Sequence, residues 1–200
     1  MPLIRKSPDT AARADPADLS STSADARWTA ARDAADRPDS VAALAAALSR
    51  ESDGRVREAI FTALTRIATE DSVAAVLPYI RSNDAGLRTG ALDALRAMPG
   101  LTRPHLPQLL ADPDGDVRLL SCDLARAMGG AEMSQILCRL IESETETNVC
   151  AAAVEALAEI GDADALPSLT RCAARFPDDP FLAFAIQAAA DRLSRQPGRD

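Results

Sequence analysis

The chain has 200 residues, a formal net charge of −8 at pH 7 and only 3% aromatic residues. This length allows one sizeable core, or an array of repeats that share a continuous core. The abundance of alanine and leucine and the scarcity of aromatic residues favour closely packed helices over sheets. The acidic balance argues against a nucleic-acid partner, because Lys and Arg side chains must displace the counterions of a phosphate backbone.

The sequence shows no membrane helix or signal peptide, and its cysteine spacing suits a reducing compartment. The longest apolar runs fall short of the roughly 20 residues of a membrane helix, and the start MPLIRKSP lacks the apolar core of a signal peptide. We therefore expect a cytoplasmic protein that has no membrane partner. The four cysteines match neither a redox pair nor a zinc ribbon, so free thiols are expected; they are Cys122, Cys138, Cys150 and Cys172.

The two ends of the chain differ from its middle. Residues 1–23 contain Pro2, Pro8 and Pro16 among Ser, Thr, Asp and Ala with no apolar period, which predicts a flexible tail. Residues 196–200 contain Pro197 and Gly198 and are predicted to fray. The structured domain is predicted over residues 24–195.

An internal repeat runs through this domain. Similar segments begin at Val56, Leu87, Val117 and Val149, which are 31, 30 and 32 residues apart. A further copy begins at Leu182, 33 residues later, and a degenerate one begins at Ala26. A fixed period of this length is typical of stacked repeat architectures, in which one unit cannot bury its apolar face alone.

Each copy predicts two helices. Apolar residues recur at helical spacing, as in Val56, Ile60, Leu64 and Ile67, and Gly129-Gly130 or Gly161 marks a helix end. A second, shorter helix fits before the next copy, over residues 72–82, 103–110, 132–141 and 163–174. The pattern predicts an all-α fold, a right-handed α-solenoid of about five helix pairs with an extra N-terminal helix.

The copy over residues 148–179 carries a family resemblance. Its segment Ala-Val-Glu-Ala-Leu-Ala-Glu-Ile-Gly, followed by Asp-Ala-Asp-Ala-Leu-Pro-Ser-Leu, resembles the HEAT-like repeats first described in phycobilisome lyases. The resemblance extends over residues 25–195. It implies a HEAT-like solenoid, and it allows functions in scaffolds, inhibitors, chaperone-like proteins and a few enzymes.

The residue after the first apolar position of each copy forms a second pattern. It is Arg27, Arg57, Arg88 and Arg118, and then Cys150 and Ala183. The resemblance implies that such arginines pair with acids of the turns, here Asp53, Asp84 and Asp114. We interpret this row of arginines as structural, and the alternative is that it has a functional role.

Candidate chemistry is sparse. Cys122 occupies a core position, and Cys150 is expected to be partly exposed. His105 is the only histidine, which excludes the His-Glu pairs that hold iron in the resembling hydroxylases and leaves no triad partner. We predict no catalytic residue, no cofactor and no metal site, and therefore no enzyme.

The remaining feature is the inner face of the array. Counted from the first apolar residue of each copy, offsets two, six and nine should face away from the core. They carry an acidic stripe with arginines and an apolar anchor. Asp93 with Arg96 and Asp123 with Arg126 are predicted pairs, three residues apart on a helix. We expect these charges to be exposed and to contribute little to folding. The predicted partner-binding residues are Asp93, Arg96, Leu119, Asp123, Arg126 and Glu155.

These residues predict a function in protein recognition. We expect a non-catalytic protein-protein interaction module, acting as adaptor, scaffold or regulator through its concave surface. The partner is predicted to be a protein with a basic or mixed-charge surface; the sequence leaves the oligomeric state open. The alternatives are a lyase-like or cofactor-handling protein, which the family resemblance allows, and an assembly chaperone.

Overall fold

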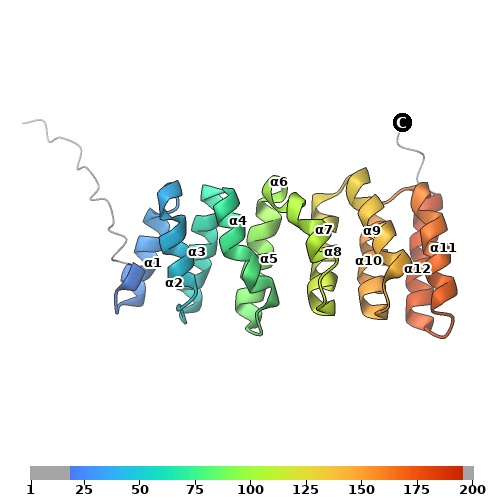
Figure 1. Ribbon diagram of the computed structural model, residues 1–200, viewed down its shortest axis with the longest axis horizontal. Coiled ribbons are helices and arrows are strands. Elements are labelled where there is room, and N and C mark those ends of the chain that lie inside the picture. The colour runs from blue at the N-terminus through green and yellow to red at the C-terminus, as the bar shows by residue number, and fades with distance from the viewer. Residues whose placement is uncertain (1–18, 196–200) are drawn as a thin grey trace, which may run out of the picture. The chain divides into compact units, whose positions relative to one another are not determined.

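The computed structural model describes residues 19–195, and every regular element in this part of the chain is helical. The chain divides into two compact units, residues 1–67 and 68–200 (Figure 1). Residues 1–18 of the predicted tail and the predicted frayed end, 196–200, lie outside the described residues.

The first unit contains α1 (Ala24–Asp33), η2 (Pro38–Ser40), α2 (Val41–Leu48) and α3 (Gly54–Ile67). α1 and α2 both pack on α3. The side chain of Ser23 accepts a hydrogen bond from the backbone N–H of Ala26, and Pro38 begins η2, where its missing N–H costs nothing. Leu44, Ile60 and Leu64 are fully buried between these helices.

Residues 19–23, part of the predicted tail, contact the first helix. Leu19 is buried, and the guanidinium of Arg27 donates to the backbone oxygens of Ser21 (2.8 Å) and Thr22 (3.3 Å). The sequence pattern could not indicate this, because a single leucine has no period and the contacts use backbone groups.

The second unit contains four helix pairs. Its elements are α4 (Glu70–Val76), η3 (Leu77–Arg81), α5 (Ala85–Ala97), α6 (Pro99–Thr102), η4 (Arg103–His105), α7 (Leu106–Leu109), α8 (Gly115–Met128), α9 (Ala131–Ser143), α10 (Thr147–Ile160), η5 (Ala163–Ala165), α11 (Leu166–Arg175) and α12 (Pro180–Ser194). α8, α10 and α12 pack side by side in this order, and α5 precedes α8 in the same series (Figure 1). α9 and α11 pack against each other, and α9 also packs on α8 and α10.

The predicted fold class is confirmed. Within residues 19–195, α1 is the extra helix and α2 with α3 forms the first pair, and the second unit supplies the other four. The predicted apolar stripes form the core: Leu95, Leu124 and Leu157 are fully buried. Burying one such leucine contributes about 1.5–3 kcal/mol, so the core of each unit depends on these stripes.

The first helix of the third pair is divided into three short elements. The sequence predicts one helix over residues 103–110, but these residues form η4 and α7, and α6 precedes them. Pro99, Pro104 and Pro107 each stand in the first turn of one of these elements, because proline has no N–H to donate and its ring clashes with the preceding turn of a continuous helix. α9, at the equivalent place in the next pair, has no proline and runs for 13 residues.

Candidate partner-binding surface

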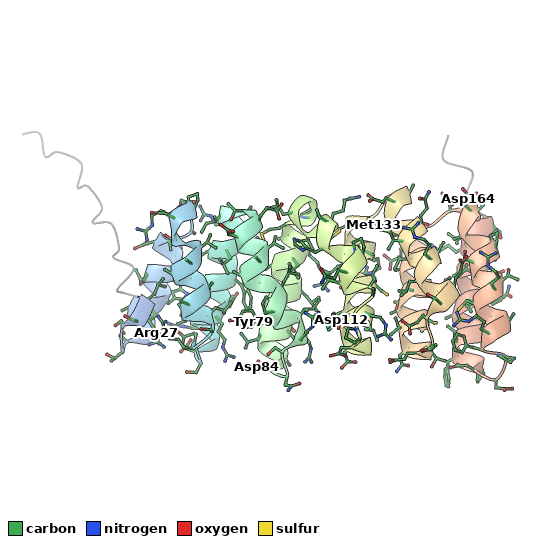
Figure 2. The ribbon with its side chains drawn as sticks, viewed as in Figure 1. Arg27, Tyr79, Asp84, Asp112, Met133 and Asp164 are labelled. Carbon is green, nitrogen blue, oxygen red and sulfur yellow. The ribbon has the colours of Figure 1, made fainter. Side chains whose placement is uncertain are left out.

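The turns before the long helices carry aspartates that cap helices. The Asp84 carboxylate accepts hydrogen bonds from the backbone N–H groups of Gly86 (2.8 Å) and Leu87 (3.1 Å). Asp53 and Asp114 accept from the first turns of α3 and α8 in the same way. An acid at this position satisfies N–H groups that have no partner within the helix. Figure 2 labels Asp84 and Asp112 in the turns before α5 and α8.

Arg27, Arg57, Arg88 and Arg118 bond to these turns through the same type of hydrogen bond. In each case a guanidinium nitrogen donates to the carbonyl oxygen six residues earlier, which ties the turn to the helix that follows it. The pairs are Arg27 with Ser21 (2.8 Å), Arg57 with Glu51 (2.7 Å), Arg88 with Ser82 (2.7 Å) and Arg118 with Asp112 (2.8 Å). These contacts support the structural interpretation of the row.

The expected aspartate partners are wrong for two of the arginines. Arg27 forms a two-pronged ion pair with Glu51 (2.7 and 2.9 Å), and Arg118 does the same with Glu144 (2.7 and 3.0 Å). Glu51 lies two residues before Asp53, whose carboxylate is directed at its own helix, α3. Glu144 lies two residues before Glu146, the N-cap residue of α10, whose side chain makes no capping hydrogen bond. Arg118 also contacts Glu146 (3.0 Å).

The two glutamates are buried, and their pKa values are low. Hydrogen bonds from Arg27 lower the pKa of Glu51 to about 2, against burial, which favours the neutral acid. Burial also opposes ionisation of Glu144, but its hydrogen bonds from Arg118 and two backbone N–H groups hold its pKa below the usual value. Both groups therefore stay charged inside the turns and stabilise them.

The cysteines are packing residues. Cys122 is fully buried, and burial raises the pKa of its thiol to about 12. The expectation that Cys150 is partly exposed is wrong: its side chain is fully buried, because the arginine position of α10 lies between α10 and its neighbours, where a small residue fits. A hydrogen bond with Cys172, together with burial, raises the pKa of Cys150.

Metal and membrane sites have no support in the part of the chain that the structure describes. Among residues 19–195, no three or more His, Cys, Asp or Glu side chains converge to hold a metal ion. The imidazole of His105 lies 3.8 Å from the Glu70 carboxylate at the surface. Each helix in this range is too short or too polar to span a bilayer.

The predicted binding residues lie on neighbouring helices of the second unit. Asp93 and Arg96 are on α5, Leu119, Asp123 and Arg126 are on α8, and Glu155 is on α10. α8 packs against α5, α9 and α10, and α10 packs against α8, α9 and α12. The exposed stripe of both helices therefore lies on the side turned away from α9. We call this side the open face; it carries Asp93, Arg96, Leu119, Asp123, Arg126, Ala151, Glu155, Glu159, Phe181 and Phe184.

Charges on the open face form an ionic chain that crosses three helices. Arg96 pairs with Asp93 (2.6 Å) on its own helix and with Asp123 on α8. Arg126 pairs with Asp123 and reaches Glu159 on α10 (3.2 Å). The sequence predicts the two pairs within helices but misses both links between helices. Glu159 lies at offset ten, one residue beyond the position that the repeat pattern indicated.

The members of the chain are not equally exposed. Asp93 keeps 65% of its side chain exposed, but Asp123 keeps only 27%. Burial opposes ionisation of Asp123, yet hydrogen bonds from Arg96 and Arg126 hold its pKa below the usual value. The expectation that all these charges are exposed is therefore wrong for Asp123. Glu155, by contrast, is exposed and pairs with no described residue.

The aromatic side chains on α1 and on α12 have different surroundings. In the first unit Trp28 is half-buried, and the guanidinium of Arg32 stacks 4.5 Å from its ring centre. In the second unit Phe181 and Phe184 on α12 are 86% and 77% exposed. They are the exposed large apolar residues of the described chain.

A cleft of about 480 Å³ lies where the proline-interrupted helix faces α9. Pro107, Leu110, Ile136 and Leu140 line it together with polar residues, which are Asp112, Arg118, Arg139, Ser143, Glu144 and Thr145. The buried charges in this lining are already paired, Arg118 with Glu144 and Asp112 with Arg81. Its other polar groups, such as Arg139, lie at the surface.

Comparison with known proteins supports the repeat assignment. Residues 103–190 match the family model for HEAT repeats, so the resemblance is confirmed for this part of the chain. No curated protein has a matching sequence.

Three solved structures are similar to the chain at low sequence identity. Two are engineered proteins: one is 18% identical, with 90% of this chain and 94% of that chain covered and a TM-score of 0.44; the other is 16% identical, with 90% and 97% covered and a TM-score of 0.47. The third is the complex of CpcE and CpcF of phycocyanin lyase from Nostoc sp. PCC7120, 16% identical, with 96% and 100% covered and a TM-score of 0.41.

Proposed function

We propose that this protein is a non-catalytic protein-interaction module, an adaptor, scaffold or regulator, that binds a protein partner through the open face of its second unit. The observation that carries the proposal is the ionic chain across α5, α8 and α10. It holds charged side chains of three consecutive repeats in fixed positions, and a preorganised surface loses little conformational entropy on binding. HEAT repeats are suited to this role because stacked pairs present one extended surface.

The chemistry of the partner follows from the charge of the second unit. Residues 68–195 contain 19 Asp and Glu and 11 Arg, a net charge of −8. An acidic surface attracts a basic or mixed-charge protein and repels a nucleic-acid backbone. We propose such a protein as the partner.

The absence of catalysis and a cytoplasmic location are also part of the proposal. Cys122, Cys150 and Cys172 are buried, and the raised thiol pKa values of Cys122 and Cys150 disfavour the nucleophilic thiolate. All four cysteines are free thiols, as is usual in a reducing compartment. The cleft beside α9 offers the cofactor-handling alternative no unpaired buried charge, because Arg118, Glu144 and Asp112 are already paired and Arg139 lies at the surface.

The proposal can be tested by affinity capture from the source cells, with cross-linking and mass spectrometry on the captured complex. The variant Asp93→Lys/Glu155→Lys should lose the partner and keep the parent's melting temperature, because both side chains are exposed. Asp71→Lys on α4 serves as a control with an exposed acid outside the open face. Asp123 is unsuitable, since reversing its charge would place three cations together.

The cross-links provide an independent readout. Cross-links from the partner to α5, α8 and α10 would support the proposal. Binding that survives in the double variant, with cross-links confined to α9 and α11, would contradict it.

A further inference from the structure

Resting on the proposed function, we infer that the partner is anchored at the α10–α12 end of the open face, by a segment that carries an apolar side chain next to Arg or Lys. The apolar side chain packs against Phe181 and Phe184, and the cation pairs with Glu155.

The two phenylalanines lie on the exposed side of α12. Phe181 and Phe184 are 86% and 77% exposed, whereas Leu182 and Ile186 on the same helix are buried. Counted from the first apolar residue of each copy, Phe184 has the same offset as Leu119 on α8 and Ala151 on α10. Those two residues lie on the open face of helices that are packed on both sides. The phenylalanines therefore belong to the open face.

The phenylalanines lie on a different side of α12 from the one that corresponds to a contact between repeats. That side carries Ala183 and Gln187, whose equivalents Cys150 and Val154 on α10 are fully buried. Nothing among the described residues covers Phe181 and Phe184.

The acids of the open face differ in whether they are already paired. The acids of the ionic chain, Asp93, Asp123 and Glu159, are already bound to Arg96 and Arg126. Glu155 on α10 is exposed and unpaired among residues 19–195, and α10 packs directly against α12. A carboxylate without a cation, on the helix next to the one that carries the exposed rings, complements a guanidinium or ammonium, which can pair with the acid and stack on a ring.

Charge also argues against a second copy of this chain as the occupant. Residues 68–195 carry the whole net charge of −8, because residues 19–67 hold seven arginines and seven acids. Two copies that meet through this face would oppose surfaces of the same sign, which disfavours association. A basic segment instead gains rate of encounter from the field and affinity from the apolar contact.

The test uses the full-length protein and a phage-displayed library of random dodecapeptides. Enriched peptides should combine Arg or Lys with a large apolar residue. Peptides synthesised from the enriched sequences should lose about tenfold or more in affinity for Phe181→Ser/Phe184→Ser, the range of truncated hot-spot residues. Affinity should also fall for Glu155→Lys and with rising salt, and it should be unchanged for Asp71→Lys. Circular dichroism and melting curves check that every variant is folded.

Three results would overturn the inference. They are enrichment of acidic or wholly polar peptides, unchanged peptide affinity in the double phenylalanine variant, and self-association in sedimentation that this variant abolishes. If the captured cellular partner is lost by Asp93→Lys/Glu155→Lys but kept by the phenylalanine variant, the proposed function stands and this anchor is wrong. If both variants keep the partner, the open face itself is wrong.

Discussion

The guanidinium of Arg118 makes five hydrogen bonds, to both carboxylate oxygens of Glu144, to Glu146 and to the carbonyl oxygens of Asp112 and Pro113. Arg88 occupies the same repeat position and donates to the carbonyl oxygen of Ser82. The row of arginines looks uniform in sequence. Its members differ because Arg118 has a buried glutamate within reach.

This difference predicts unequal losses of stability. Arg118→Ala should lower the free energy of unfolding by about 3 kcal/mol, because it leaves the buried charge of Glu144 without its partner. Arg88→Ala should cost about 1 kcal/mol, the value of one hydrogen bond. Urea denaturation followed by circular dichroism measures both. Equal losses would show that Glu144 does not depend on Arg118.

Glu51 in the first unit makes a pH-dependent contribution. Its pKa is about 2 in the folded protein and 4.5 as the reference value, so the folded state binds its proton more weakly than the unfolded chain. The stabilisation is complete above pH 4.5 and disappears as the pH falls towards 2.

The matching prediction compares the protein with Glu51→Gln, which keeps the size of the side chain. The variant should be less stable at pH 7, and the difference in unfolding free energy should shrink as the pH falls from 4.5 towards 2. Urea titrations at several pH values measure it. A difference that is independent of pH would contradict the assigned pKa shift.

At the scale of single elements, helix ends decide where each repeat turns. α10 ends at Ile160, and at the next residue, Gly161, an added Cβ would lie 2.6 Å from the carbonyl oxygen of Leu157. A Cβ added to Gly100, which lies in α6, would meet no atom within 4 Å. The two glycines therefore differ in whether they have room for a side chain.

Gly161→Ala should destabilise the protein by about 1–3 kcal/mol, because backbone atoms must move to relieve the contact. Gly100→Ala is the matched control, and it should be neutral or stabilising by up to about 1 kcal/mol. Melting temperature and urea denaturation report the change. Tolerance of alanine at residue 161 would mean that this turn can adjust without cost.

At the scale of the whole molecule, charge is unevenly distributed along the chain. Residues 19–67 are balanced, and residues 68–195 carry the net charge of −8. Long-range attraction of a basic partner therefore comes from the second unit, and added salt screens it. The proposed open face and its aromatic end lie in this same unit.

The helix pairs, their number and much of the core follow from the sequence pattern alone. Periodic residues such as Val56, Leu95 and Leu157 are buried because a helix repeats its apolar positions within a few residues, which is local information. It also predicted the pairs Asp93 with Arg96 and Asp123 with Arg126, since residues three apart on a helix are neighbours.

Which charged groups are available depends on the tertiary structure. The partners of Arg27 and Arg118 lie 24 and 26 residues away. The links from Arg96 to Asp123 and from Arg126 to Glu159 join residues 27 and 33 positions apart. Cys150 is buried and bonds to Cys172, about 22 residues later. Distances between side chains of stacked repeats depend on helix packing and side-chain length, which a repeat offset does not specify. The same packing leaves Glu155, Phe181 and Phe184 exposed.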